Sequence, residues 1–161
     1  MKAFVIDVNV AVVANGRGTH ADYDCILACV DVIEKVCQNG MIVIDDGMHI
    51  LSEYMSRLRM EGQPGVGDAF MQWVWENQAV VSRCEQVKLT VRGDDPEDFL
   101  EFPHDPELDN FDRSDRKYVS VAVESRRNPE ILNAVDTDWW QYKEAFMRKG
   151  IRVQFLCPQH M

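Results

Sequence analysis

Short apolar runs alternate with longer amphipathic stretches along most of this chain, and the alternation limits the folds that it can adopt. The short runs lie at residues 3–6, 41–44, 131–135 and 151–156. Runs of this length are typical of buried strands, whereas the stretches between them have the three- and four-residue spacing of helices. Strands that alternate with helices form right-handed βαβ units around a parallel sheet. We therefore predict an α/β fold: a three-layer α/β/α sandwich with a central, mostly parallel sheet.

Amphipathic spacing and helix-breaking residues give approximate bounds for the helices. Asn39-Gly40 and Asn128-Pro129 supply two of the stops. Two of the expected helices are placed by their neighbours: a short one directly after the first strand, and one that follows Asp45-Asp46 and contains Glu53. The other expected helices cover residues 22–38, 66–77, 112–126 and 139–149.

The segment from residue 79 to 110 has the weakest pattern in the chain. Residues 87–91 alternate between apolar and polar side chains, which predicts a strand near a sheet edge. Residues 93–110 are rich in Pro and Asp. We interpret them as a surface loop with a short helix at 97–101.

Length and charge set broad limits on organisation and function. A chain of 161 residues predicts a single domain, residues 1–161. The net charge of −10 argues against a basic surface that would hold nucleic acid non-specifically. It does not exclude a nuclease, because carboxylates gathered around metal ions add to the negative count. We expect no signal peptide and no membrane span, and hence a cytoplasmic location.

The cysteines and histidines show no pattern that points to a framework of disulfides or to zinc. Cys25, Cys29, Cys37, Cys84 and Cys157 are odd in number and irregular in spacing. In a cytoplasmic protein most would be small buried hydrophobic residues. Cys25-x-x-x-Cys29 by itself is a helical pair, and the four histidines have no zinc-like spacing with the cysteines.

Four acidic residues stand where a solvated charge is not expected. Asp7 and Asp136 each follow an apolar strand, at the edge of a parallel sheet where ligands usually bind. Asp115 lies on the apolar side of its helix, and Glu53 is flanked by Ile50, Leu51 and Tyr54. A carboxylate buried in this way is costly unless it is paired or bound to metal.

Clustered carboxylates fit a hard divalent cation such as Mg²⁺ or Mn²⁺, which prefers oxygen ligands. A site of this kind suits phosphodiester hydrolysis, because the metal activates water and stabilises the charge that develops around phosphorus. Simpler roles stay open for each acid: Asp7, Asp112, Asp136 and Asp138 as helix caps, Asp115 as a first-turn partner of the helix dipole, and Glu53 as the partner of Arg57.

The order of these motifs resembles the PIN-domain ribonuclease family. The chain has Val5-Ile6-Asp7-Val8-Asn9 at its first strand, Ile50-Leu51-Ser52-Glu53-Tyr54 in a helix, Asp115 at the start of a small-residue helix, and Asp136-Thr137-Asp138-Trp139 after a later strand. Together these motifs span almost the whole chain.

The resemblance implies a metal-dependent endoribonuclease that acts on single-stranded RNA. By position, Asp7, Glu53, Asp115 and Asp136 would carry Mg²⁺ or Mn²⁺, with Asp138 and Asp112 as outer or alternative ligands. Asn9 would hydrogen-bond near the site. Arg17 and Arg116, like Arg113 and Lys117, could reach a phosphate of the substrate, although a solvated surface position is the simpler role for each. Many small members of the family are toxins of toxin–antitoxin pairs, which adds an antitoxin and a homodimer as candidate partners.

The chain departs from the family pattern at two positions near the expected metal. Val8 stands where the family often has Ser or Thr, and Ala134 stands where it often has Thr. The alternative function is therefore a catalytically weak or inactive PIN-like domain that binds RNA or protein. A phospho-aspartate phosphatase is disfavoured, because Asp7-Val8-Asn9 lacks the second aspartate that would serve as general acid.

Overall fold

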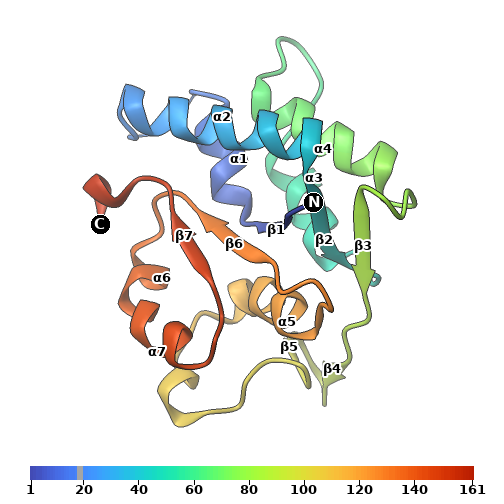
Figure 1. Ribbon diagram of the computed structural model, residues 1–161, viewed down its shortest axis with the longest axis vertical. Coiled ribbons are helices and arrows are strands. Elements are labelled where there is room, and N and C mark those ends of the chain that lie inside the picture. The colour runs from blue at the N-terminus through green and yellow to red at the C-terminus, as the bar shows by residue number, and fades with distance from the viewer. Residues whose placement is uncertain (18–19) are drawn as a thin grey trace.

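The computed structural model describes residues 1–17 and 20–161 and has a central five-stranded sheet with helices on both faces (Figure 1). All neighbouring strands of this sheet are parallel. The predicted α/β/α architecture is confirmed. The strands, in spatial order, are β3 (Cys84–Val87), β2 (Met41–Asp45), β1 (Ala3–Ile6), β6 (Glu130–Asn133) and β7 (Val153–Phe155).

The helices form one layer on each side of the sheet. On one side α1 (Val8–Ala14), α2 (Tyr23–Asn39) and α4 (Val66–Asn77) contact one another. On the other side α5 (Arg116–Glu124) lies against β1, β2 and β6, and α6 (Thr137–Gln141) and α7 (Lys143–Arg148) cover the end of the sheet at β7 (Figure 1). The remaining helix, α3 (His49–Arg57), contacts both α4 and α5.

Most predicted helix bounds are close to the observed ones. The helix predicted at 66–77 is α4, and the helix predicted at 22–38 is α2, with Asp22 as its N-cap. The single helix predicted at 139–149 is wrong, because the chain breaks at Tyr142 into α6 and α7. The break lets Trp139, Tyr142 and Phe146 all contact the ring of Phe111.

The prediction for the segment 79–110 is wrong in two respects. The sheet strand is β3, which ends at Val87, and 93–110 is not a surface loop. β4 (Val91–Arg92) and β5 (Asp95–Phe99) form an antiparallel hairpin, followed by the 3₁₀ helix η1 (Pro106–Leu108). Phe99, Phe102 and Leu108 are buried. These apolar residues are irregularly spaced, so no periodic pattern reveals them in the sequence.

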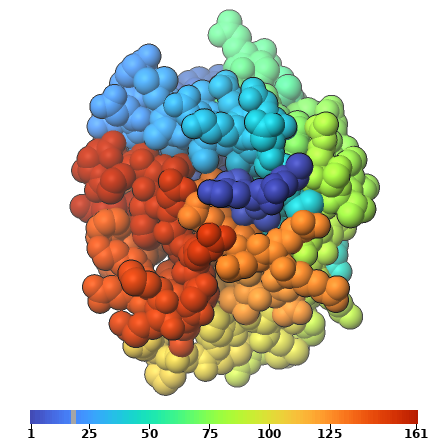
Figure 2. Space-filling model, in the orientation of Figure 1, coloured from blue at the N-terminus to red at the C-terminus, as the bar shows by residue number. Residues whose placement is uncertain are grey.

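The C-terminal segment is tied to the start of α2. Cys25 of α2 and Cys157, which precedes the 3₁₀ helix η3 (Pro158–His160), form a disulfide. Figure 2 shows the C-terminal residues in red against the blue surface of α2. The reading of the cysteines as mainly buried hydrophobic residues is therefore wrong for this pair, whose members are 132 positions apart. Within residues 1–17 and 20–161, no helix is long and apolar enough to cross a membrane.

Candidate metal centre

Two of the predicted acids lie at the carboxyl ends of neighbouring strands. Asp7 directly follows β1, and Asp136 lies three residues beyond the end of β6, which pairs with β1. Each carboxylate also caps a helix: Asp7 accepts from the backbone N–H of Asn9 at 3.0 Å, and Asp136 from that of Asp138 at 3.0 Å. Asp7 and Asp136 therefore each cap a helix and also lie at the edge of the sheet where ligands bind.

A third carboxylate meets them from the helical layer. Asp115 ends the 3₁₀ helix η2 (Arg113–Asp115), which leads directly into α5, and its side chain is buried. One carboxylate oxygen from each of Asp7, Asp115 and Asp136 lies within 4.8 Å of the other two. We refer to these three residues as the acidic centre. Of the four predicted metal ligands, the structure brings these three together, and Glu53 is not part of the group.

Burial and mutual repulsion make the charged forms of the acidic centre costly. Burial raises the pKa of Asp7 to about 7, with added repulsion from Glu53 and Asp136. Burial also raises the pKa of Asp115 to about 9, with added repulsion from Asp7 and Asp136. The pKa of Asp136 is raised as well, chiefly by burial. A divalent cation would neutralise this repulsion, and the donor set consists of oxygen atoms, as Mg²⁺ and Mn²⁺ require.

Glu53 lies beside the acidic centre but is already engaged. Its carboxylate accepts a hydrogen bond from the hydroxyl of Tyr118 and pairs with the ammonium group of Lys117 at 3.3 Å. The Tyr118 hydroxyl also accepts from the backbone N–H of Val8 at 3.3 Å, next to Asp7. Glu53 is therefore connected to the centre through Tyr118, and its partner is Lys117 instead of Arg57.

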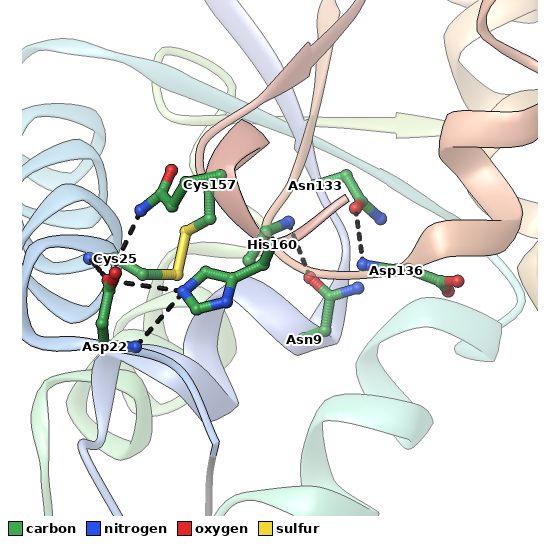
Figure 3. Close-up of a disulfide and its surroundings, with 9 residues drawn as sticks. Asn9, Asp22, Cys25, Asn133, Asp136, Cys157 and His160 are labelled. Atoms are coloured by element: carbon green, nitrogen blue, oxygen red, sulfur yellow. Dashed lines mark hydrogen bonds and ion pairs between the residues drawn. A yellow bond between two sulfur atoms is a disulfide. The ribbon is translucent and has the colours of Figure 1, made fainter.

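Two asparagines hold the loops that carry Asp7 and Asp136 (Figure 3). The Asn9 side chain accepts from the backbone N–H of Ala134 at 2.9 Å, which links α1 to the loop after β6. The buried Asn133 contacts Asp7 Oδ2 through Nδ2 at 3.5 Å and accepts from the backbone N–H of Asp136 at 3.2 Å. Asn9 was expected near the site, whereas Asn133 was missed. Its signal in the sequence is a polar residue inside the apolar run 131–135.

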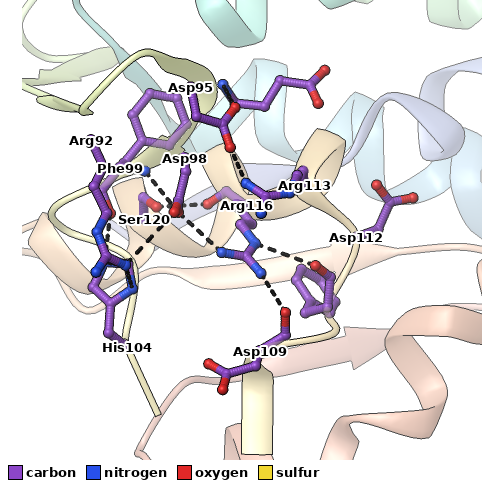
Figure 4. A network of polar contacts seen from close by, with 12 residues as sticks. Arg92, Asp95, Asp98, Phe99, His104, Asp109, Asp112, Arg113, Arg116 and Ser120 are labelled. Carbon is purple, nitrogen blue, oxygen red and sulfur yellow. Dashed lines mark hydrogen bonds and ion pairs between the residues drawn. The ribbon is translucent and has the colours of Figure 1, made fainter. Parts of the chain in front are cut away.

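The structure gives Arg116 an interior role. Its guanidinium pairs with Asp98 at 3.1 Å and donates to the backbone carbonyl oxygens of Asp109 and Phe111 (Figure 4). It also lies over the ring of Phe102. Only 5% of Arg116 is exposed, and Lys117 is also buried. The prediction that these two side chains are solvated is wrong, because the hairpin covers them.

The other predicted residues lie outside the acidic centre. Arg17 lies at the far end of α1 from Asp7 and pairs with the buried Asp68 at 3.0 Å. Asp138 is exposed in the first turn of α6. Asp112 is also exposed and caps η2 by accepting from the backbone N–H of Ser114 at 2.9 Å. Asp112 nevertheless raises the pKa of both Asp115 and Asp136, so it lies close enough to act on the centre electrostatically.

A small cavity opens beside the Glu53–Lys117 pair. Its volume is about 150 Å³, and its lining includes His49 of α3, Glu97 of β5, and Arg113 and Lys117. Arg113 is largely exposed and forms an ion pair with Asp95. The cavity therefore brings two cationic side chains next to an acidic site in a chain of net negative charge.

Comparison of the chain with models of protein families, with curated proteins and with solved structures found no match.

Proposed function

We propose that this chain is a nuclease of the PIN type that depends on Mg²⁺ or Mn²⁺ and hydrolyses phosphodiester bonds in single-stranded RNA. The observation that carries the proposal is the convergence of Asp7, Asp115 and Asp136 from three separate segments. Two come from the ends of adjacent parallel strands, which is where α/β folds bind ligands. The RNA substrate rests on the resemblance of the motifs to PIN-domain ribonucleases.

The residues present suit a hard cation. Asp7, Asp115 and Asp136 would hold it, and a bound cation would favour the charged forms of these carboxyls, whose pKa values are raised chiefly by burial. When bound, the cation would supply an activated water and stabilise negative charge around phosphorus. Asn133 contacts Asp7 and accepts a hydrogen bond from the backbone of Asp136, so two of the three carboxylates are held in place by the same side chain. Arg113 and Lys117, which line the small cavity, are candidate cationic side chains for a substrate phosphate.

A second candidate is a binding module of the same fold with little or no catalysis. Glu53, a ligand in the motif pattern, is paired with Lys117 and Tyr118 in this chain. Val8 and Ala134 are buried and offer no hydroxyl beside the acidic centre. These features would weaken the centre without removing it, and the chain would then bind RNA or protein.

Three further proposals accompany this function. An antitoxin and a second copy of the chain are candidate partners through the resemblance alone. A cytoplasmic location is expected from the sequence, but the Cys25–Cys157 disulfide argues against it, because disulfides persist mainly in oxidising compartments. A cytoplasmic location is consistent with this structure only if Cys25 and Cys157 also have a reduced state.

Cleavage of a labelled single-stranded RNA, with Mn²⁺ or with EDTA, tests the enzymatic proposal. We expect cleavage only with the metal, and a loss of at least about 100-fold in Asp7→Asn, because removal of one charge weakens both metal binding and charge stabilisation. Asp31→Asn is the matched control and should retain most activity, since Asp31 is exposed in α2 and is not one of the predicted ligands. Cleavage in EDTA, or an Asp7→Asn variant as active as wild type, would refute the nuclease. Metal-independent RNA binding without cleavage would favour the binding module.

A further inference from the structure

Three cysteine sulfur atoms meet beneath the C-terminal segment. The Sγ atoms of Cys25, Cys29 and Cys157 all lie within 4.8 Å of one another, and all three residues are fully buried. Cys25 and Cys29 are one turn apart in α2 and therefore share a face of that helix. Cys157 reaches this face from the segment after β7. Cys29 keeps a free thiol beside the Cys25–Cys157 disulfide.

A histidine lies at the edge of this cluster. His160 Nε2 is 3.3 Å from the backbone nitrogen of Asp22, and Asp22 Oδ1 accepts from the backbone N–H of Cys25 at 2.8 Å. Figure 3 shows the His160 imidazole beside the disulfide. The chain thus supplies Cys25-x₃-Cys29 from one helix and Cys157-x₂-His160 from the C-terminal segment. The spacing of Cys25 and Cys29 lies within the range seen for paired cysteine ligands of structural zinc. The fold brings Cys157 and His160 to this pair, which their positions in the sequence do not indicate.

We propose that the reduced chain binds one Zn²⁺ through the thiolates of Cys25, Cys29 and Cys157, with His160 as the fourth ligand, and that the disulfide is the oxidised, metal-free form of the same site. Three thiolates and one imidazole form a closed tetrahedral set of the kind that holds structural zinc. The acidic centre has only oxygen donors, so the two sites prefer different metals.

The distances allow the exchange without a new backbone arrangement. Zn–S bonds of about 2.3 Å place the sulfur atoms of a tetrahedral site roughly 3.8 Å apart. The three sulfur atoms already lie within 4.8 Å of each other, so side-chain rotation after the disulfide opens is sufficient. His160 lies outside this group of three sulfur atoms and would have to turn from Asp22 toward the metal; its side chain is partly exposed.

The chemistry of the change balances with a dithiol as reductant. The dithiol gives two electrons and two protons to the Cys25–Cys157 bond and becomes a disulfide itself. The chain then carries three adjacent thiols, and Zn²⁺ displaces their three protons as it binds. The C-terminal segment therefore remains fastened to α2 in both states, first by the S–S bond and then by the metal.

Co²⁺ is a suitable probe, because thiolate ligands give it a charge-transfer absorption that oxygen ligands do not give. The full chain is reduced under anaerobic conditions, freed of reductant and titrated with Co²⁺, then with Zn²⁺. We expect one Co²⁺ per chain with thiolate charge transfer and tetrahedral d–d bands, and loss of both on addition of Zn²⁺. The oxidised chain should show neither band. Absence of the charge-transfer absorption in the reduced chain would overturn the proposal.

Variants test the role of the Cys29 thiolate independently of the Cys25–Cys157 disulfide. Cys29→Ser should still form the Cys25–Cys157 disulfide when oxidised but should bind Co²⁺ at least about 100-fold more weakly when reduced. Cys84→Ser is the matched control: Cys84 is a buried free cysteine in β3, and its loss should leave the Co²⁺ spectrum unchanged. His160→Ala should shift the d–d bands while charge transfer persists. A Cys29→Ser variant with the wild-type spectrum would contradict the proposal. The acidic centre gives no thiolate band, so this test is independent of the nuclease test.

Discussion

Asp7 joins local and long-range structure in one side chain. It caps α1 through the backbone N–H of Asn9, and its other oxygen lies near Asn133, on the neighbouring strand. Only 3% of the residue is exposed, so its charge depends strongly on what surrounds it. Asp115 has the same dependence without a capping hydrogen bond to hold the charged form. These two residues therefore make the stability of the chain sensitive to pH and to metal.

The stability of the metal-free chain should fall as the pH rises. The pKa of Asp7 is raised to about 7 and that of Asp115 to about 9, from an ordinary value of 3.8. The folded chain therefore holds these protons more tightly than the unfolded chain does. Their contribution to stability is full below about pH 4 and is lost as the pH rises through 7 and 9. In EDTA, we expect a lower Tm at pH 8 than at pH 5 from this contribution.

Asp115→Asn removes an ionisable group that the folded chain must keep protonated, and it should be more stable than wild type at pH 8 in EDTA. Addition of Mn²⁺ at pH 8 should raise the Tm of wild type and have a much smaller effect on Asp115→Asn. Thermal unfolding followed by circular dichroism measures both effects. Asp31→Asn, an exposed change in α2, serves as the control. If wild type and Asp115→Asn lose stability in parallel between pH 5 and 8, burial of Asp115 is not the cause.

At the scale of elements, the β4–β5 hairpin depends on α5. Asp98 of β5 is buried against Arg116 of α5, and Arg116 also donates to the backbone carbonyl oxygens of Asp109 and Phe111 (Figure 4). The guanidinium lies over the ring of Phe102 as well. One guanidinium thus fastens the hairpin and the following segment to the helix whose preceding turn carries Asp115. The hairpin indirectly positions the acidic centre.

Removal of Arg116 should leave the buried carboxylate of Asp98 with only a longer ion pair, to the partly exposed Arg92 at 3.8 Å. We expect Arg116→Met to lower the free energy of unfolding by about 3 kcal/mol, because Asp98 would lose its buried counter-charge. The double variant Arg116→Met with Asp98→Leu should recover part of the loss. Arg113→Met is the control: its ion pair with Asp95 is largely exposed, so the expected cost is about 1 kcal/mol or less. Urea denaturation gives all three values, and equal costs for Arg113→Met and Arg116→Met would contradict the interior role of Arg116.

At the scale of the whole molecule, the last residues of the chain close the fold. Cys157 is bonded to Cys25 across 132 positions, and Leu156 donates to the backbone carbonyl of Asn133 at 2.9 Å. His160 Nε2 also lies 3.3 Å from the backbone nitrogen of Asp22 and 3.4 Å from its Oδ1. The C-terminal segment therefore joins the first long helix to the strand end that carries the acidic centre.

Loss of the disulfide should destabilise the entire chain. In EDTA no metal replaces the bond. We expect the free energy of unfolding of Cys157→Ser to be roughly 2–5 kcal/mol lower than that of oxidised wild type, because the unfolded chain without the cross-link has a higher conformational entropy. Reduced wild type should match Cys157→Ser. Cys37→Ser, which changes a partly buried free cysteine, should stay close to oxidised wild type. Coincident urea curves for oxidised and reduced wild type would show that the bond adds no stability.

Features with a local cause could be predicted from the sequence. The four apolar runs at 3–6, 41–44, 131–135 and 151–156 correspond to β1, β2, β6 and β7. The three acids of the centre were among the predicted ligands, since two of them end a strand and the third lies on an apolar helix face. The hairpin at 91–99 escaped prediction because its strands are short and its first strand is exposed, so neither has an alternating pattern.

By itself, then, the sequence determined the parallel sheet and the placing of Asp7 and Asp136 at its edge, because periodicity and strand ends are properties of neighbouring residues. The tertiary structure alone decided which distant side chains meet. It paired Glu53 with Lys117, placed Arg116 on Asp98, and brought Cys157 to Cys25 and Cys29. Contacts between residues far apart in the chain depend on how the layers pack, and such packing leaves no spacing signal in the sequence.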